Sequence, residues 1–227
     1  MKQNYPPEEI RADFCIVLKI VFLFVIINLR GDIMGLFDKL KKKENTTKCN
    51  QVQNADLIKA AIQTTCSNLI QQCRDANLPY EITHKYQKGM IIREKGFVDA
   101  TALSGGIVTN HRYIILSNHM ASLAQFEGDK QWALCVANRD SRFLVLGKAE
   151  DKERRVTVLL HLNDDSWQLF KSIDMSIFQN LLNDCYNSFK ECIFKEPIAS
   201  VSTDEWFARC QFPVGMSDSG EFFPVDD

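Results

Sequence analysis

The sequence predicts an α+β domain, with an antiparallel meander sheet of about five to seven strands packed by two long amphipathic helices. Residues 104–162 contain a succession of short apolar segments separated by polar turns, at a spacing of about ten residues that is typical of a meander. On either side, residues 54–76 and 176–196 carry apolar residues at steps of three and four, which indicates helices. The hydrophobic content of 45% and charged content of 25% are those of an ordinary globular domain.

The chain divides into four predicted parts, which differ in composition. They are an N-terminal hydrophobic segment (1–33), a basic and polar linker (34–53), a globular α+β domain (54–212) and an acidic C-terminal tail (213–227). With 227 residues in all, one domain of this size buries a sizeable core without disulfides or metals. The rings of Phe222 and Phe223 offer the acidic tail a way to dock on the domain.

The N-terminal segment contains a run of sixteen residues, from Phe14 to Leu29, whose only charge is Lys19. As a helix it spans about 24 Å, which is short of the roughly 30 Å of a hydrocarbon core. One interpretation is a marginal single-pass anchor in the cytoplasmic membrane, with the lysines after it on the cytoplasmic side. The other is that translation starts at Met34 and the segment is not expressed. Both interpretations place the main domain in the cytoplasm.

The charge is unevenly placed along the chain. The formal net charge is −2, but residues 38–48 carry +3 and the body from Cys49 onward carries −5, with 18 basic and 23 acidic residues. An acidic body lacks the basic footprint of a nucleic-acid-binding protein, so nucleic acid is disfavoured as a partner. We expect a protein partner, and a membrane contact through residues 14–29 if they are expressed.

The eight cysteines form no CxxC pair and no cluster with histidine at zinc-ligand spacing, so we expect neither a metal nor a cofactor. Cys66 and Cys73 are seven residues apart, as are Cys185 and Cys192, which places each pair on one face of a predicted helix. We expect buried free thiols in a reducing cytosol. A disulfide between the two helices is the alternative.

The first predicted helix begins at Asn54, a good N-cap residue, and ends before Pro79. Ser117 is expected to cap a short helix that reaches Phe126. Residues 147–153 are expected to form a charged turn. Strands are expected at residues 90–93, 97–103, 107–116, 132–137, 143–146 and 156–162. The last of these (VTVLLHL) has the unbroken apolar run of a central strand buried on both faces, and His161 within it is expected to be a hydrogen-bonded core residue.

Two capping boxes precede the C-terminal helices. Ser176 with Gln179 opens the second long helix, which Pro197 ends. Ser202 with Glu205 opens a short helix.

Candidate site residues cluster at two predicted turns. Arg139, Asp140 and Arg142 lie within five residues (NRDSR), where two guanidinium groups can bind a carboxylate or phosphate bidentately. The alternative is that Asp140 bonds to its own turn and that the arginines are solvated. His111 and Arg112 form a second turn, which joins the first if both turns fall at the same end of the sheet.

No catalytic, metal or nucleotide motif is present in the sequence. We therefore expect a non-enzymatic protein-interaction module, of the immunity or adaptor type, rather than an enzyme. The alternative is a hydrolase or transferase acting on an anionic substrate, with His111 or His119 as base and Arg139 or Arg142 as anion ligand. The least favoured class is a single-strand nucleic-acid binder that uses the sheet aromatics Tyr113, Trp132 and Phe143.

Overall fold

The computed structural model describes residues 47–226, with side chains from Ala55 onward. The chain forms two compact units, residues 1–68 and 69–227. The described part of the first unit is helix α2 (Thr47–Cys66) and the two residues that follow it. The predicted N-terminal anchor lies outside the described residues. Among residues 47–226 no helix is both long and apolar enough to cross a membrane, so no described helix fulfils the prediction of a transmembrane helix.

The first predicted helix is wrong at both ends. The observed helix begins at Thr47, seven residues before the predicted cap, and the last seven residues of the predicted helix form a strand, β1 (Ile70–Ala76). Asn68 ends the helical region because its φ of 52° lies in the left-handed region, which asparagine tolerates better than most residues. Apolar residues at 69, 73 and 76 suit a helical period, so the pattern alone did not reveal the break.

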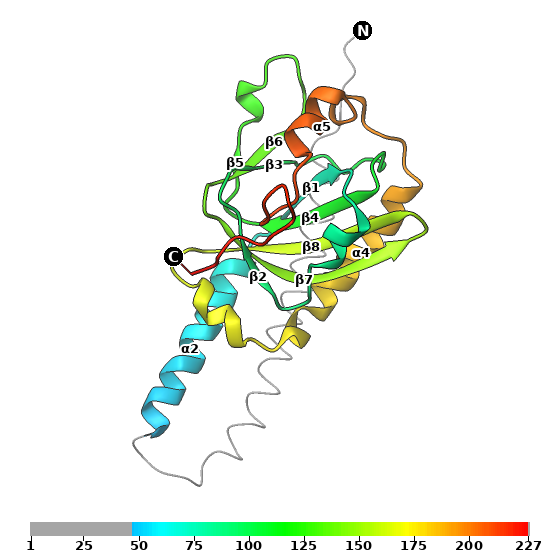
Figure 1. The fold of residues 1–227 in the computed structure, drawn as a ribbon. Coiled ribbons are helices and arrows are strands. Elements are labelled where there is room, and N and C mark those ends of the chain that lie inside the picture. Colours follow the sequence, from blue (N-terminus) through cyan, green and yellow to red (C-terminus); the bar gives the residue numbers. More distant parts are fainter. Residues whose placement is uncertain (1–46, 227) are drawn as a thin grey trace. The chain divides into compact units, whose positions relative to one another are not determined.

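Eight strands of the described chain form one mixed sheet in the order β2-β7-β8-β4-β1-β3-β6-β5 (Figure 1). The predicted meander is wrong, because β4 and β8 are parallel neighbours and β1 lies between β4 and β3. Parallel neighbours require a crossover connection, which the polar turns of the sequence do not reveal. Besides β1, the strands are β2 (Ile91–Arg93), β3 (Val98–Thr101), β4 (His111–Ser117), β5 (Ala121–Ser122), β6 (Leu134–Ala137), β7 (Arg142–Asp151) and β8 (Arg154–Leu162).

The prediction of two long helices packed on the sheet is also wrong. In the second unit one long helix, α4 (Gln179–Ile193), packs on β7 and β8. The shorter α5 (Asp204–Cys210) packs on β1 and β3. The remaining helical segments of this unit are short: α3 (Tyr80–His84), η1 (Ala124–Phe126), η2 (Trp167–Ser172), η3 (Met175–Phe178) and η4 (Ala199–Val201).

Two side chains of β1 that point to opposite faces show which element covers each face of the sheet. The Gln71 amide donates a hydrogen bond to Ser188 of α4 at 3.2 Å. Arg74 points the other way and donates to the carbonyl oxygens of Arg209 at 3.4 Å and Phe212 at 3.2 Å, at the end of α5. Because side chains alternate along a strand, α4 covers one face, and α5 with the segment after it covers the other.

The second face has a hydrophobic core that includes part of the C-terminal segment. Tyr86 donates a 2.7 Å hydrogen bond to the carbonyl oxygen of Val214, and its hydroxyl lies 2.7 Å from that of Tyr113 on β4. The ring of Phe222 packs edge-on against Tyr86, with 5.7 Å between the ring centres. Strand β8 is buried from Val156 to Leu162, which confirms its predicted central position.

Three local predictions fail where long-range contacts decide the backbone. Residues 117–126 form β5 and η1 rather than a helix, because Ala121 and Ser122 pair with β6. Strand β7 continues through most of the predicted charged turn and pairs with β8 as far as Asp151. The predicted capping boxes are displaced: Asp174 accepts from the Ser176 N–H before α4, and Thr203 rather than Ser202 accepts from the Trp206 N–H.

The six described cysteines are free thiols. Cys66 ends a helix and Cys73 lies on a strand, so the first pair does not share a helical face. Cys185 and Cys192 are both buried on α4, as their spacing predicts. A disulfide between two helices is absent from this set of six.

Candidate functional site

The structure places the predicted site residues at opposite ends of β8. His111 pairs with Arg155 at the start of β8, whereas Arg142 pairs with Leu162 at its end. Seven residues of strand separate these two positions, which is about 23 Å at roughly 3.3 Å per residue. Proton transfer and substrate binding in one site require groups within hydrogen-bond reach, so His111 and Arg142 cannot act together.

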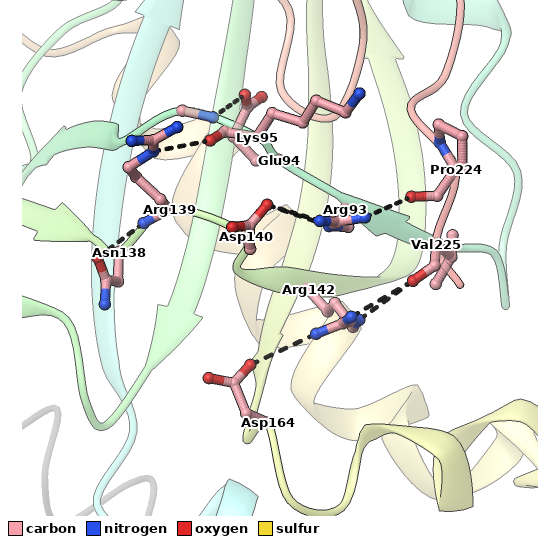
Figure 2. Close-up of polar contacts among 11 residues, drawn as sticks. Arg93, Glu94, Lys95, Asn138, Arg139, Asp140, Arg142, Asp164, Pro224 and Val225 are labelled. Atoms are coloured by element: carbon pink, nitrogen blue, oxygen red, sulfur yellow. Dashed lines mark hydrogen bonds and ion pairs between the residues drawn. The ribbon is translucent and has the colours of Figure 1, made fainter. Parts of the chain in front are cut away.

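The NRDSR turn is a network of internal contacts (Figure 2). Arg93 of β2 donates two hydrogen bonds to one oxygen of Asp140, at 2.8 and 3.2 Å. Asp140 is therefore paired with an arginine from the neighbouring strand, a partner that neither sequence interpretation anticipated. Arg139 is exposed, and its guanidinium makes one long contact of 3.5 Å with the carbonyl oxygen of Lys95.

Arg142 is occupied by contacts within the chain. Its guanidinium lies over the ring of Trp167, 4.5 Å from the ring centre, and 3.6 Å from a carboxylate oxygen of Asp164. It also donates to the carbonyl oxygen of Val225 through two nitrogens, each at 3.4 Å (Figure 2). This end of the sheet therefore binds the C-terminal residues of the same chain.

The side chain of Arg112 is buried and stabilises the fold. It is 3% exposed and forms a bidentate ion pair with Asp75, at 2.6 and 2.7 Å. A third nitrogen donates to the carbonyl oxygen of Gly105 at 3.0 Å. These contacts tie β1 and β4 to the loop before β4, and they occupy the donors that an anionic ligand requires.

His111 differs from the other predicted residues because its polar atoms are unpaired. It is 1% exposed, and within the described chain neither ring nitrogen has a hydrogen-bond partner. Its ring packs edge-on against Tyr113, with 4.6 Å between the ring centres. Burial lowers the pKa of His111 to about 3, and the positive charge of Arg155 acts in the same direction. The imidazole is therefore neutral at pH 7 and carries one donor and one acceptor.

His111 lines a cavity of about 280 Å³ between α3, β7 and β8. The hydroxyl of Thr157, on the same face of β8, is likewise buried and has no partner among the described residues. The other polar side chains that line the cavity are Tyr80, Thr83, His84, Lys148, Glu150 and Arg155. The cavity thus combines a neutral imidazole, three hydroxyls, two cationic side chains and one carboxylate, besides His84.

Arg155 is held in the cavity wall by neutral groups. It donates to the Thr83 hydroxyl at 2.6 Å and to the carbonyl oxygen of Leu78 at 3.0 Å, and it lies 5.7 Å from the centre of the Tyr80 ring. Among the described residues no carboxylate forms an ion pair with it within 4 Å. The nearest strand neighbour with a carboxylate is Glu150, which lies opposite Arg155 on β7 and lines the same cavity without forming an ion pair with it. The sequence did not single out Arg155 or Thr157, because both read as ordinary strand residues.

The opposite end of the same strand pair contains a histidine that has a hydrogen-bond partner. His161 lies 2.9 Å from the Ser117 hydroxyl, through Nδ1, and its ring stacks between Phe143 at 4.8 Å and His119 at 3.9 Å. Ser117 Oγ accepts the backbone N–H groups of His119 and Met120, so its own proton points to His161. This arrangement confirms the predicted core histidine.

No group of three histidine, cysteine, aspartate or glutamate side chains in residues 55–226 is placed to hold a metal ion.

No protein-family model and no curated protein matches the chain. Among solved structures, it is similar to the ADP-ribosyltransferase HopU1 of Pseudomonas syringae, with 13% identity and a TM-score of 0.38 over 41% of this chain and 46% of that one. A second is the ADP-ribosyltransferase Vis in complex with an inhibitor, with 13% identity and a TM-score of 0.37 over 73% of this chain and 89% of that one.

A third solved structure is exoenzyme S of Pseudomonas aeruginosa in complex with human 14-3-3 protein beta and carba-NAD, with 13% identity and a TM-score of 0.38 over 60% of this chain and 76% of that one. The match to HopU1 spans less than half of that protein's length. Identities and TM-scores this low do not place the chain in a family, and no residue role is transferred from these proteins.

The prediction of a non-enzymatic adaptor module is corrected by these comparisons. HopU1 and Vis, to which the chain is similar, are ADP-ribosyltransferases and not adaptors.

Proposed function

We propose that the chain is an enzyme of the hydrolase or transferase type that binds a small anionic substrate in the His111 cavity. The observation that carries the proposal is the unpaired state of both His111 ring nitrogens beside a cavity. Leaving a buried polar group unpaired costs about 1–3 kcal/mol, so such groups in a native structure require an explanation. A ligand that pairs with the imidazole supplies one.

The charge of the cavity supports an anionic ligand. Arg155 has no carboxylate partner in the described chain, and a guanidinium binds carboxylate or phosphate groups through two parallel hydrogen bonds. Lys148 reaches the carbonyl oxygen of His84 at 2.7 Å and adds a second positive charge. A volume of about 280 Å³ fits a small carboxylate or phosphate ester rather than a polymer.

The residues of the cavity suggest distinct roles. Arg155 binds the anionic group, and the Thr157 hydroxyl orients the substrate by a hydrogen bond. The neutral imidazole of His111 accepts a proton from water or from an acceptor hydroxyl as its oxygen bonds to the carbonyl carbon or phosphorus of the substrate. The bond to the leaving oxygen breaks, and the imidazolium returns its proton to that oxygen. An anion bound beside Arg155 offsets the positive charge that acts on His111, so the pKa of the imidazole rises toward the range useful for general base catalysis.

We place this activity in the cytoplasm. The six described cysteines support that proposal, since all are free thiols, as a reducing compartment maintains them.

A binding and turnover experiment on the purified full chain tests the proposal. Calorimetric titration with inorganic phosphate and with small carboxylates should show saturable binding that Arg155→Met weakens at least about tenfold. Arg139→Met is the matched control, because it removes an equal charge from an exposed arginine outside the cavity. Turnover is then screened with phosphate esters, carboxylic esters and NAD, whose carba analogue is present in the exoenzyme S structure.

In that screen His111→Asn should lower the turnover number by about 100-fold or more, as expected for loss of a general base. The proposal is overturned if wild-type protein neither binds these anions nor turns over any substrate. It is equally overturned if His111→Asn keeps full turnover.

A further inference from the structure

Four cationic side chains surround the last described residues of the chain, far from the His111 cavity. Arg93 donates to the carbonyl oxygen of Pro224 at 3.4 Å, and Arg142 donates to that of Val225 at 3.4 Å (Figure 2). Lys171 forms an ion pair with Asp226 at 3.1 Å. The ammonium group of Lys95 lies 5.1 Å from the centre of the Phe223 ring. We call Arg93, Lys95, Arg142 and Lys171 the clamp, and residues 223–226 the strap.

The strap differs from the part of the C-terminal segment that precedes it. Val214 and Met216 are 1% and 3% exposed, and the N–H of Gly215 donates to Glu94 at 2.7 Å, so this part belongs to the core. A tight turn follows, in which Gly220 has a φ of +76° and its N–H donates to the carbonyl oxygen of Ser217. The strap begins beyond this turn, and none of its residues is fully buried.

The contacts between clamp and strap are individually weak. The carbonyl hydrogen bonds of 3.4 Å lie at the long end of the accepted range. The pair of Lys171 with Asp226 is 49% and 69% exposed, and exposed ion pairs add little stability. Asp140 and Asp164 stay beside Arg93 and Arg142 when the strap leaves, so release strands no buried charge.

We propose that the clamp is a docking site for an extended segment of a partner protein, with an aromatic residue, a proline and then an acidic residue, and that the strap is its intramolecular competitor. Charge complementarity supports this partner, because four cations face carbonyl oxygens, an aromatic ring and a carboxylate. The seated strap shows that the surface accepts such a segment. The proposal does not depend on the activity proposed for His111.

A peptide-binding experiment tests the proposal. A fluorescent peptide with the sequence of residues 221–227 (EFFPVDD) is titrated with the full chain, and its anisotropy is measured. A bound strap lowers the apparent affinity by the fraction of open molecules. A strap variant with Phe223→Ala and Asp226→Asn should therefore bind the peptide about threefold more tightly than wild type. Binding should weaken as salt is added.

Two clamp variants and a matched control decide whether the site is the clamp. Placed in the strap variant, Arg142→Met should abolish binding of the peptide, whereas Arg139→Met, in the same turn but outside the clamp, should leave it unchanged. Lys171→Gln, at an exposed position, should weaken binding at least about threefold and decides the case if Arg142→Met unfolds. Equal binding by the clamp variants and the Arg139→Met control overturns the proposal. So does a strap variant that binds no peptide.

Discussion

His111 and His161 lie on the same face of the parallel strands β4 and β8, at opposite ends, and both are buried. Burial lowers the pKa of each to about 3. The difference is in their partners: His161 bonds to Ser117 and stacks between two rings, whereas His111 has no hydrogen-bond partner in the described chain. The unpaired histidine is the one that borders a cavity. The comparison shows that burial alone does not distinguish a core histidine from a candidate catalytic one.

The arginines of the two ends differ in the same way. Arg142 has Asp164, Trp167 and a carbonyl oxygen of the strap as partners, while Arg155 is held by neutral groups. One end of the strand pair therefore has its charges satisfied by the chain itself. The other end retains unused capacity for an anion.

The largest expected effect comes from the buried ion pair of Arg112. Arg112→Met should lower the free energy of unfolding by about 3–5 kcal/mol, because it leaves Asp75 without its partner. Arg155→Met should lower it by about 1–3 kcal/mol, since two hydrogen bonds to neutral groups are lost but no buried charge is left unpaired. Urea denaturation of both variants measures the difference. Equal destabilisation would show that Arg155 is as structural as Arg112.

The two histidines should respond differently to an apolar substitution. His161→Leu should lower the free energy of unfolding by about 2–3 kcal/mol, because Ser117 loses its acceptor and two ring stacks are removed. His111→Leu should be close to neutral, since no hydrogen bond is lost and two unpaired polar atoms are removed. The comparison fails if denaturant titration finds His111→Leu the more damaging of the two.

Stability should also depend on pH through both histidines. Each has a folded-state pKa of about 3, below the ordinary value of 6.5, so the unfolded chain binds more protons between these limits. The contribution of these two histidines to the free energy of unfolding is fully present above about pH 6.5. It is lost as the pH falls, by up to about 1.4 kcal/mol per pH unit for each histidine. His111→Leu should remove about half of this slope. Denaturant titrations between pH 7 and pH 4 measure the slope of the unfolding free energy against pH. A slope that is the same in wild type and in His111→Leu would contradict the lowered pKa of His111.

The smallest expected effect on stability belongs to the strap. The Phe223→Ala and Asp226→Asn double variant should lower the free energy of unfolding by less than about 1 kcal/mol, because its contacts are exposed. Hydrogen exchange should nevertheless increase at the amide of residue 223, which donates to the carbonyl oxygen of Gly215, and remain unchanged at Val214. A loss of protection that reaches Val214 would mean that strap and core form one cooperative unit.

Several features followed from the sequence alone. The unbroken apolar run of β8 predicted a central strand, and the spacing of Cys185 and Cys192 predicted one buried helical face. His161 was predicted as a core histidine for the same reason, since its position lies inside that run. These are properties of local periodicity, which depends on residues close together in the chain.

The tertiary structure decided the rest, because it depends on residues far apart in the chain. Strand order, the parallel pairing of β4 with β8, and the strand conformation of β1 arise from long-range backbone hydrogen bonds. His111 was named from the sequence, but its unpaired ring and its cavity became evident only when α3, β7 and β8 were brought around it. Burial and hydrogen-bond partners are properties of the packed chain, and periodicity does not encode which polar group is left without a partner.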